Sequence, residues 1–589
     1  MTDATFALGI DLGTTNSALA SVPMANKTDS PKPLAIPQTV APGETMAENL
    51  LPSFLYMSAE AERAPGAFAL PWRETNEQVV GTYARKQGAA TPDRLISSAK
   101  SWLSYSGIDR REQVLPWQAP EGIPKISPLE ASAQYLAHLG AAWDAAHPES
   151  PLSQQDVVLT VPASFDAAAR DLTVEAASQI GLKDNLRLLE EPQAALYAWL
   201  ADKGDAWRDE LSVGDTILVC DIGGGTTDFS LISVQEEEGV LQLERVAVGD
   251  HILLGGDNMD LALAYSVSAK LEQKGKRLDD WQMRGLVHGC RAAKESLLAD
   301  ESRDTYPLAI ASRGSRLMGG TIRTELTRPE LEATLLEGFF PDVDASARPQ
   351  VPRRMGLTTL GLPYASDAAV TRHLAAFLAR SQSTGGMTYP TTILFNGGVT
   401  RSPVIRNRIL KVLEAWAAAD GATGPKVLAG GDPDLAVSRG AAFYAQARQQ
   451  GGLRIKGGTA RSYYIGVERN QMAVPGIAPK LDALCIAPFG MEEGTEVHLS
   501  DPFGLYVGEP VSFRFFGSSE RQQDPVGAVV DPAQLAEVAP IETTLDGEEG
   551  SVVHVRLHAR VSEVGTLEIS AVDVDSERRW KLSFDVRVE

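Results

Sequence analysis

Two segments with the same residue pattern decide the fold of this chain: GIDLGTTNSALA at residues 9–20 and VCDIGGGTTDFSLI at residues 219–232. Each runs from an apolar stretch to an Asp, then to Gly and Thr residues, and then into a second apolar stretch. The pattern predicts a β-hairpin whose tight turn presents backbone N–H groups, hydroxyls and one carboxylate, because Gly adopts unusual backbone conformations at little cost. Its repetition predicts two related lobes.

The turns have the chemistry of a phosphate site. Successive backbone N–H groups in such a turn form a nest for an anion. Asp11 and Asp221 cannot bind phosphate directly, but they can hold a hydrated divalent cation that does. The chain has no GxxxxGK[ST] motif, and GGGTTD leads into a β-branched strand rather than a helix, so neither the Walker A nor the Rossmann arrangement is indicated. Either copy alone could be an ordinary hairpin, but together they predict a nucleotide clamped between two lobes.

Size and charge narrow the class of protein. The chain has 589 residues, too many for one core, so we expect two or more domains. Its net charge of −23 argues against nucleic acid or an anionic membrane as the main partner. The first ten residues carry no basic targeting segment, and no apolar stretch is long enough to span a bilayer. Cys220, Cys290 and Cys485 are dispersed, which predicts buried thiols in a reducing, cytoplasmic compartment.

Histidines give no sign of a metal site. The eight His residues show no metal-ligand spacing. His554 and His558 alternate with Val and Leu in VVHVRLHARV, which predicts that they lie on the solvated face of a strand.

The chain divides into two unlike regions. Residues 1–450 alternate strands with helices, the pattern of an α/β domain, and we expect the nucleotide there. Residues 451–462 are a Gly-rich linker, and residues 463–589 alternate apolar and polar positions as antiparallel strands of a β-sandwich do. Two helices rich in Ala and Gly, at 192–200 and 433–447, could approach closely, because small side chains permit tight crossings that can act as a hinge.

Several motifs occur in the order found in one family. The two hairpins, the strand ending at Pro162, EEPQAALYA, GGDN, the helix carrying Lys294, NGGVTRSP and DPDLAVSRGAA resemble the heat-shock protein 70 (DnaK-type) chaperones of the actin, sugar-kinase and heat-shock ATPase superfamily. The likeness covers residues 6–447 and, more weakly, the β region. It implies an α/β fold: a two-lobed, actin-like ATPase domain of duplicated ribonuclease H type, followed by an all-β sandwich without the family's helical lid.

The resemblance also implies a set of site residues. Asp11, Asp221 and Thr226 would position magnesium, its waters and the attacking water, and Glu191 would be the acid near them. This arrangement suits phosphoryl transfer, which depends mainly on positioning and electrostatics. The first phosphate loop would be Gly13, Thr14, Thr15 and Asn16, and the second Gly223, Gly224, Gly225, Thr226 and Thr227, with further backbone donors from Gly255 and Gly256. The adenosine pocket would be Lys294, Gly397, Gly398, Arg401, Ser402 and Asp434. Pro162 and Arg170 resemble the family's interlobe switch.

The chain departs from the family in four places, one of which is the missing helical lid. The family's catalytic Lys falls on Arg85 in VVGTYARKQG, with Lys86 beside it, and an Arg fork is not equivalent to a Lys point charge. The adenosine helix reads CRAAKESLL, in which Arg291, Glu295 and Leu298 replace the usual acid, Arg and Ser. RIKGG stands in place of the short Leu- and Asp-rich linker, so coupling between the domains cannot be assumed. A peptide site without a lid would open and release quickly.

Three functions follow, in order of preference. The first is an ATP-hydrolysing chaperone in which ATP and Mg²⁺, with K⁺ as a further candidate ion, close the lobes and control a β-sandwich that grips unfolded or partner polypeptide. J-domain and exchange partners would accompany it. The second is a low-turnover, nucleotide-gated regulatory or exchange-factor-like protein, favoured by Arg85 and the altered linker. The third is a small-molecule kinase on the same superfamily fold.

Overall fold

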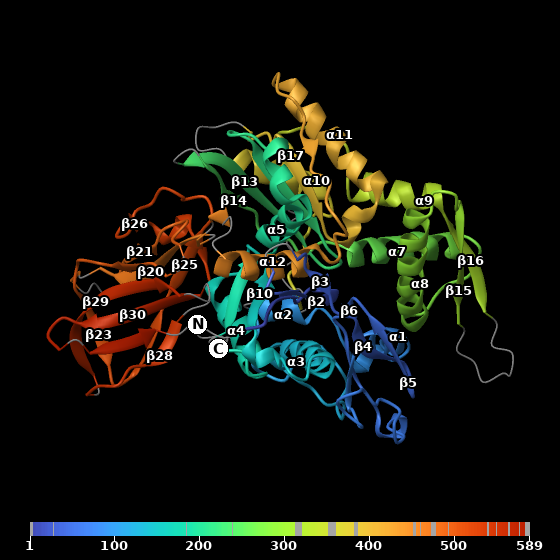
Figure 1. Ribbon diagram of the computed structural model, residues 1–589, viewed down its shortest axis with the longest axis horizontal. Coiled ribbons are helices and arrows are strands. Elements are labelled where there is room, and N and C mark those ends of the chain that lie inside the picture. The colour runs from blue at the N-terminus through green and yellow to red at the C-terminus, as the bar shows by residue number, and fades with distance from the viewer. Residues whose placement is uncertain are drawn as a thin grey trace.

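The structure is a computed structural model of the whole chain (Figure 1). The residues it describes are 4–26, 29–105, 107–183, 185–237, 240–311, 321–350, 361–381, 387–450, 455–456, 458–459, 461–469, 471–472, 479–492, 494–538, 541–548, 550–562, 566–576 and 578–582. Two mixed α/β lobes lie side by side, and a region of β-strands, orange to red in Figure 1, packs beside the first lobe.

The first lobe is built on a six-stranded sheet of order β11-β10-β1-β2-β3, with β6 pairing β2. The strands are β1 (Phe6–Asp11), β2 (Asn16–Pro23), β3 (Lys32–Pro33), β6 (Leu51–Pro52), β10 (Asp156–Val161) and β11 (Leu186–Glu190). β1 and β2 form the antiparallel hairpin expected from the sequence, while β10 runs parallel to β1. Pro162 directly follows β10, since proline has no N–H to continue a ladder.

The second lobe repeats this plan with a sheet of order β18-β17-β12-β13-β14-β19. Its strands are β12 (Thr216–Ile222), β13 (Thr227–Glu237), β14 (Val240–Val248), β17 (Thr392–Asn396), β18 (Lys426–Val427) and β19 (Ile455–Lys456). β12 and β13 are the second hairpin, and β17 runs parallel to β12 as β10 does to β1. The matching order of hairpin and parallel strands is the structural counterpart of the repeated sequence pattern.

The carboxyl ends of the parallel strands place the key side chains. Asp11 ends β1 and Glu190 ends β11, while Asp221 and Asn396 lie at the corresponding ends of β12 and β17. Ligands of open α/β sheets bind beyond this edge, so the two sheets aim their polar residues at one space.

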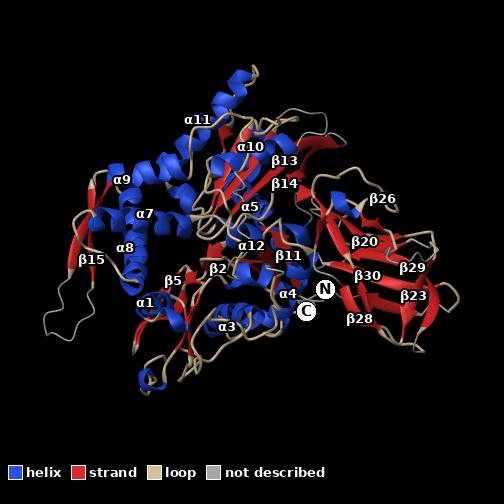
Figure 2. Ribbon diagram, turned by 180° about the vertical axis from the view of Figure 1, so that it is seen from behind, coloured by secondary structure: helices blue, strands red, loops and turns tan. Residues whose placement is uncertain are grey.

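Helices cover both sheets, and small hairpins extend the lobes (Figure 2). The helices are α1 (Thr82–Ala90), α2 (Ala99–Ser104), α3 (Pro128–Ala146), α4 (Ala167–Ser178), α5 (Glu191–Lys203), α6 (Trp207–Glu210), α7 (Gly256–Glu272), α8 (Asp280–Ala299), α9 (Arg328–Glu332), α10 (Val370–Arg380), α11 (Pro403–Ala419) and α12 (Ala436–Gln450). The outlying strands are β4 (Ile36–Ala41) with β5 (Glu44–Glu48), β7 (Leu55–Met57) with β8 (Gln78–Val80) and β9 (Leu95–Ile96), and β15 (Thr305–Ile310) with β16 (Ile322–Thr327).

The two small-residue helices, α5 and α12, meet at the centre of the molecule. A Cβ added to Gly440 would lie 1.7 Å from the backbone O of Ala194, and one added to Gly9 on β1 would lie 2.1 Å from the backbone O of Ser438. The close approach expected from the sequence is therefore confirmed. The second helix begins at Ala436, later than expected, because Asp432 accepts from the Asp434 and Leu435 N–H groups and closes a turn.

The C-terminal region consists of antiparallel strands in two five-stranded sheets and a two-stranded one. The first sheet holds β20 (Ser462–Glu468), β21 (Leu481–Ala487), β25 (Phe515–Ser518), β26 (Val529–Val530) and β27 (Ala536–Glu537). The second holds β22 (Glu496–His498), β23 (Phe503–Val507), β29 (Ser551–Val561), β30 (Leu567–Asp573) and β31 (Arg579–Leu582), and β24 (Pro510–Phe513) pairs β28 (Ile541–Thr544). We call residues 461–582 the β domain.

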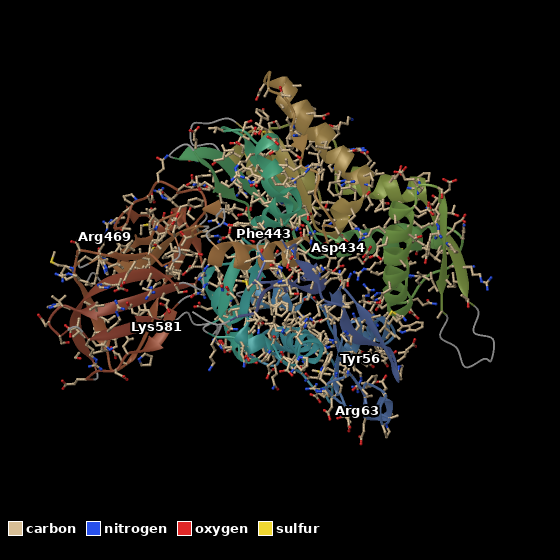
Figure 3. All side chains as sticks on the ribbon, in the orientation of Figure 1. Tyr56, Arg63, Asp434, Phe443, Arg469 and Lys581 are labelled. Carbon is tan, nitrogen blue, oxygen red and sulfur yellow. The ribbon has the colours of Figure 1, made fainter. Side chains whose placement is uncertain are left out.

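The β domain packs against the first lobe. Buried apolar side chains of both, such as Phe165 and Leu172 of the lobe and Tyr463 of the β domain, belong to one continuous cluster. Burial raises the pKa of Asp171 on α4 to about 7. The charge of Lys581 on β31, labelled in Figure 3, acts in the opposite direction and lowers this pKa. Within the predicted linker 451–462, residues 455–456 form β19 and pair with β14; residues 451–454, 457 and 460 lie outside the described residues.

Two further expectations can be compared with the structure. Cys220, Cys290 and Cys485 are free and buried, as expected. Among the described residues, no helix is both long and apolar enough to cross a membrane.

Replacing Gly440 with Ala should push α5 and α12 apart, because the obstructing atoms are backbone. We expect the free energy of unfolding to fall by about 3 kcal/mol, the upper end of typical overpacking costs. Gly285→Ala is the matched control, because Gly285 is an exposed position of α8 with nothing within 4 Å of the added carbon; it should gain about 0.5–1 kcal/mol. Differential scanning calorimetry measures both, and equal transition midpoints would contradict the tight crossing.

Candidate functional site

A cleft of ≈ 600 Å³, counting the open space at its mouth, lies between the carboxyl ends of the two sheets. It is lined by Asp11, Gly13, Thr14, Thr15, Asn16, Lys100, Glu191, Asp221, Gly223, Gly224, Thr226, Asn396, Gly397, Gly398, Pro433, Asp434 and Val437. Figure 3 shows Asp434 in the middle of the molecule, where the lobes meet. Both hairpin turns therefore contribute to one space of a size that suits a small ligand.

The two turns touch each other across this cleft. A Cβ added to Gly224 would lie 2.0 Å from Oγ1 of Thr15, and one added to Gly225 would lie 2.6 Å from Cγ2 of Thr14. Within the first turn the backbone is equally tight, because a Cβ on Gly13 would lie 2.1 Å from the backbone O of Asn16. The close approach of the two turns thus leaves no room for a Cβ at these positions, and the glycines bring bare main chain from both lobes to one place.

Asp11 and Asp221 form an electronegative centre at the base of the cleft. Burial, and then the charge of Glu191, raise the pKa of Asp11 to about 7 and that of Asp221 to about 8. Thr160 donates to Oδ1 of Asp11 over 3.3 Å, and Nδ2 of Asn396 donates to Oδ2 of Asp221 over 2.7 Å. These bonds orient the carboxylates but do not offset their desolvation, which a bound cation would do.

Lys100 and Glu191 form a buried ion pair at the cleft. Lys100 lies on α2, preceded by Ser98 at a φ of 55°, and its side chain is 7% exposed. Burial acts to lower the pKa of its ammonium group, but the carboxylates of Glu191 and Asp11 outweigh burial and raise it. A permanently charged ammonium therefore faces the same space as the two Asp carboxylates.

Arg85 and Lys86, the sequence-based candidates for this cation, do not line the cleft. They lie on α1, where Lys86 is exposed and Arg85 half-buried. Burial, followed by the charges of Arg291 and Arg85 among others, lowers the pKa of His288, which places Arg85 toward α8 of the second lobe. The motif VVGTYARKQG thus predicts a cation from α1, whereas in the structure α2 provides the cation that lines the cleft.

Thr227, Gly255 and Gly256 support the second turn from behind, whereas Gly225 faces Thr14 of the first turn. The N–H of Gly256 donates to the backbone O of Gly223 over 3.1 Å, and that of Gly255 donates to Asn258 over 2.9 Å. Thr227 is buried in β13 and donates to the backbone O of Leu254. Because these N–H groups already have protein acceptors, Gly255 and Gly256 shape the second turn rather than add free donors to the cleft.

The expected adenosine residues divide into two groups. Gly397, at a φ of +82°, Gly398 and Asp434 line the cleft, and a Cβ on Gly398 would lie 3.2 Å from Asp434. Arg401 pairs with Asp434 from the exposed side, and Ser402 caps α11. Lys294 instead turns to Asp260 at 2.8 Å and to the backbone O of Gly256 at 2.9 Å, beside the ion pairs of Arg291 with Asp257 and Asp260.

Pro162 begins a segment that contacts the second lobe. Ser164 donates to Asp228 of β13 over 2.8 Å, and Asp228 also pairs with His251 at 3.2 Å. Arg170 on α4 lies 2.8 Å from Oε1 of Glu190, whose other oxygen accepts from Arg245 on β14. The Ser164–Asp228 and Glu190–Arg245 contacts join the two lobes, whereas Arg170 contacts Glu190 within the first lobe.

The residues of the cleft fit a magnesium-bound nucleotide. Across the part of the chain that the structure describes, the hydroxyl of Thr15 and the amide oxygen of Asn396 are buried without a hydrogen-bond partner. Buried polar atoms of this kind are costly unless a ligand or water satisfies them. Burial also favours the protonated forms of the Asp11 and Asp221 carboxylates. A cation and an oxygen-rich ligand would satisfy both the unpaired polar atoms and these two carboxylates.

Sequence reasoning missed Lys100, Asn396, Glu190 and Arg245. The only signal for Lys100 was a lysine at an apolar helix position in ISSAKSWL, and NGGV contained Asn396 next to two glycines already chosen. Glu190 directly precedes Glu191, and the motif EEPQ gave no sign that the two acids have different partners. Arg245 alternates with apolar residues in LQLERVAV, which favoured an ordinary strand face.

Comparison with known proteins identifies the family of this chain. A family model described as Hsp70 protein matches residues 7–347, more than half of the chain. The Chaperone protein HscA homolog of Bordetella pertussis is 29% identical over 74% of this chain and 57% of its own length. That of Bordetella petrii is 29% identical over 77% of this chain and 59% of its own length. That of Aeromonas salmonicida is 31% identical over 56% of this chain and 47% of its own length.

The chain thus spans about half to three-fifths of the length of these relatives. The family match covers the first hairpin, the Pro162 segment, the second hairpin and the helix of Lys294, and the structure arranges these motifs as an α/β, actin-like nucleotide domain joined to a β domain. The chain belongs to the Hsp70 family.

Proposed function

We propose that this chain is an ATP-hydrolysing chaperone that binds ATP with Mg²⁺ in the cleft and uses the nucleotide to control polypeptide binding by the β domain. The observation that carries the proposal is the meeting of the two glycine turns around Asp11, Asp221 and the Lys100–Glu191 pair. Phosphoryl transfer needs mainly positioning and charge stabilisation, and these residues supply both.

Each group has a role that follows from its chemistry. The backbone N–H groups of the two turns cradle phosphate oxygens, and Asp11 and Asp221 hold the water shell of Mg²⁺, which neutralises phosphate charge when bound. The Lys100 ammonium stabilises charge on the transferred phosphoryl group. Glu191 accepts a hydrogen bond from water at the cleft and keeps Lys100 in place. K⁺ is a further candidate ion among the same carboxylates.

A second candidate is a nucleotide-gated binding protein with little turnover. It is favoured by the tight pairing of Lys100 with Glu191, which leaves each group engaged by the other. A small-molecule kinase is the third candidate, and dependence of ATP turnover on a sugar or acid acceptor would reveal it. A cytoplasmic location is supported by three buried, free thiols.

We also propose a route between the cleft and the β domain. Glu190 directly precedes Glu191 of the cleft and binds Arg170 of the first lobe and Arg245 of the second. Arg245 is fully buried, donates to the backbone O of Gly458 over 2.8 Å, and lies 6.0 Å from the ring centre of Phe489. One carboxylate thus ties both lobes to the segment that enters the β domain.

A polypeptide client would bind the β domain through apolar contacts. Tyr506 on β23 and Val552 on β29 face each other across the strands and are 54% and 51% exposed. Exposed apolar pairs on a sheet suit an extended peptide, whose side chains alternate in the same way. J-domain and exchange partners are part of the proposal, and family membership is their support.

Lys100→Met should slow single-turnover ATP hydrolysis by about 10²–10³-fold, the cost of removing one preorganised electrostatic group. Arg85→Met and Lys86→Met are the matched controls and should hydrolyse ATP at close to the wild-type rate. Asp11→Asn and Asp221→Asn report whether turnover uses this cleft. The reverse pattern, with loss in Arg85→Met or Lys86→Met and none in Lys100→Met, would contradict the role of Lys100. ATP that binds and stays intact in the wild type would instead favour the low-turnover candidate.

Glu190→Gln should abolish stimulation of ATP turnover by unfolded peptide while basal turnover persists. The neutral amide cannot balance two buried guanidinium groups, and breaking such a network typically costs about 3–5 kcal/mol, so Arg170→Lys serves as a milder second variant. Glu175→Gln is the control, because Glu175 forms an exposed pair with Arg111 on the same helix as Arg170. The measurement is the ratio of turnover with and without peptide; an unchanged ratio in both network variants would refute the route.

Replacing Tyr506 and Val552 together with Ser should weaken binding of a labelled unfolded peptide by about tenfold, equivalent to about 1.4 kcal/mol of lost apolar contact. Fluorescence anisotropy measures the change in Kd. Val529→Ser is the control, because Val529 is 60% exposed but lies on β26 of the other sheet. Loss of peptide affinity in Val529→Ser alone would show that the peptide binds the other sheet and would contradict this site.

A further inference from the structure

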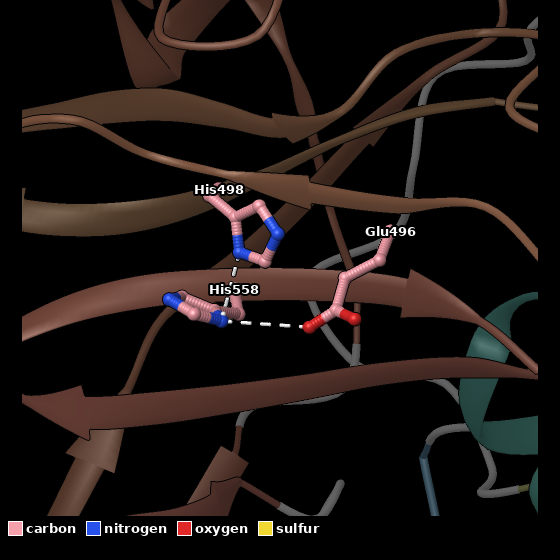
Figure 4. A group of neighbouring side chains, drawn as sticks. All are labelled: Glu496, His498 and His558. Carbon is pink, nitrogen blue, oxygen red and sulfur yellow. Dashed lines mark hydrogen bonds and ion pairs between the residues drawn. The ribbon is translucent and has the colours of Figure 1, made fainter. Parts of the chain in front are cut away.

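Three side chains from two strands meet on the outer face of the β domain (Figure 4). Glu496 and His498 lie two residues apart on β22 and therefore share a face of the sheet. The antiparallel register of β22 and β29 places His498 directly opposite His558. Sixty residues separate the two histidines in the chain, so only strand pairing brings them together.

Their polar atoms converge on one point. The Nδ1 atoms of His498 and His558 are 2.9 Å apart, and Nδ1 of His558 is 3.4 Å from Oε1 of Glu496. One ligand atom from each of the three residues lies within 4.8 Å of the other two. Tetrahedral Zn²⁺ with bonds of about 2.0–2.1 Å requires ligand atoms separated by about 3.3 Å, so the two shorter spacings are already close to those of a coordination shell.

Nδ1 of His558 has more hydrogen-bond donors around it than it can accept from, and a bound cation would remove this mismatch. Nη2 of Arg579 lies 3.2 Å from Nδ1 of His558 and 3.1 Å from Oε1 of Glu496. A guanidinium group only donates, so Nδ1 of His558 must accept from it, and the same lone pair faces Nδ1 of His498. Two donors thus compete for one lone pair. A dication in place of the Arg579 guanidinium would let each imidazole use its own lone pair as a ligand.

Arg579 is the cation that contacts this cluster in the structure. Its side chain is 54% exposed, so the guanidinium can swing into solvent.

We propose that Glu496, His498 and His558 form a binding site for a borderline transition-metal dication, with Zn²⁺ as its representative, and that Arg579 occupies the position of that ion when it is absent. Two imidazole nitrogens and one carboxylate oxygen suit Zn²⁺, whereas Mg²⁺ and Ca²⁺ prefer oxygen ligands alone. Water would complete the shell, because the site is open to solvent. The ion would fasten the short strand β22 to the long strand β29.

The test is a Zn²⁺ titration of the intact chain by isothermal calorimetry, with the Zn²⁺-induced change in thermal midpoint as a second readout. Ions bound elsewhere, including the nucleotide cleft, are common to all variants and cancel in the comparison. His498→Ala and His558→Ala should weaken the binding event by at least tenfold, because loss of a direct ligand exceeds the roughly 10–100-fold cost of losing a supporting partner. The same variants should lose the Zn²⁺-induced rise in midpoint.

Two further variants sharpen the test. His554→Ala should leave Zn²⁺ affinity unchanged, because His554 lies on the same face of β29 but pairs across the sheet with Gly504 rather than with a ligand. Arg579→Ala should bind Zn²⁺ more tightly, because the competing cation is gone. Equal Zn²⁺ affinity in wild type and His498→Ala, an equal loss in His554→Ala, or weaker binding in Arg579→Ala would overturn the proposal.

Discussion

Desolvation of two carboxylates between the lobes is the constraint on which the rest of the structure depends. Asp11 and Asp221 end paired strands of two sheets, and burial together with Glu191 raises the pKa of both. The lobes meet closely around them: Gly224 packs against the Thr15 side chain and Gly440 against the Ala194 backbone, and neither position has room for a Cβ. The fold therefore maintains an electrostatically costly arrangement that a cation and a phosphate chain would relieve.

The same residues connect the cleft to the rest of the molecule. Consecutive acids at the start of α5 face opposite ways: Glu191 pairs with Lys100 at the cleft, and Glu190 pairs with arginines from both lobes. Arg245 continues the network to Gly458 and Phe489, where the chain enters the β domain. A shift of one lobe against the other would have to break or move charged contacts in a dry environment, which makes this connection sensitive to small movements.

Sequence and structure agree best where the argument rested on local pattern. The two hairpins, the strand ending at Pro162 and the close crossing of α5 and α12 all follow from glycine, proline and small-residue positions that act within a few residues or one packing contact. Sequence and structure disagree where the position of a residue within a motif was used to predict its place in the folded molecule. Arg85 and Lys86 occupy α1, while Lys100, from the following helix, reaches the cleft.

The sequence by itself determined that this chain carries a duplicated hairpin with a glycine turn in an α/β domain followed by a β region, because glycine turns and apolar alternation are local properties. Only the tertiary structure decided which cation faces Asp11 and Asp221, that Glu190 joins both arginines, and that His498 meets His558. The physical reason is the same in each case. These partners lie on different elements, separated by tens of residues or more, and their meeting depends on strand register and helix packing, which no local pattern encodes.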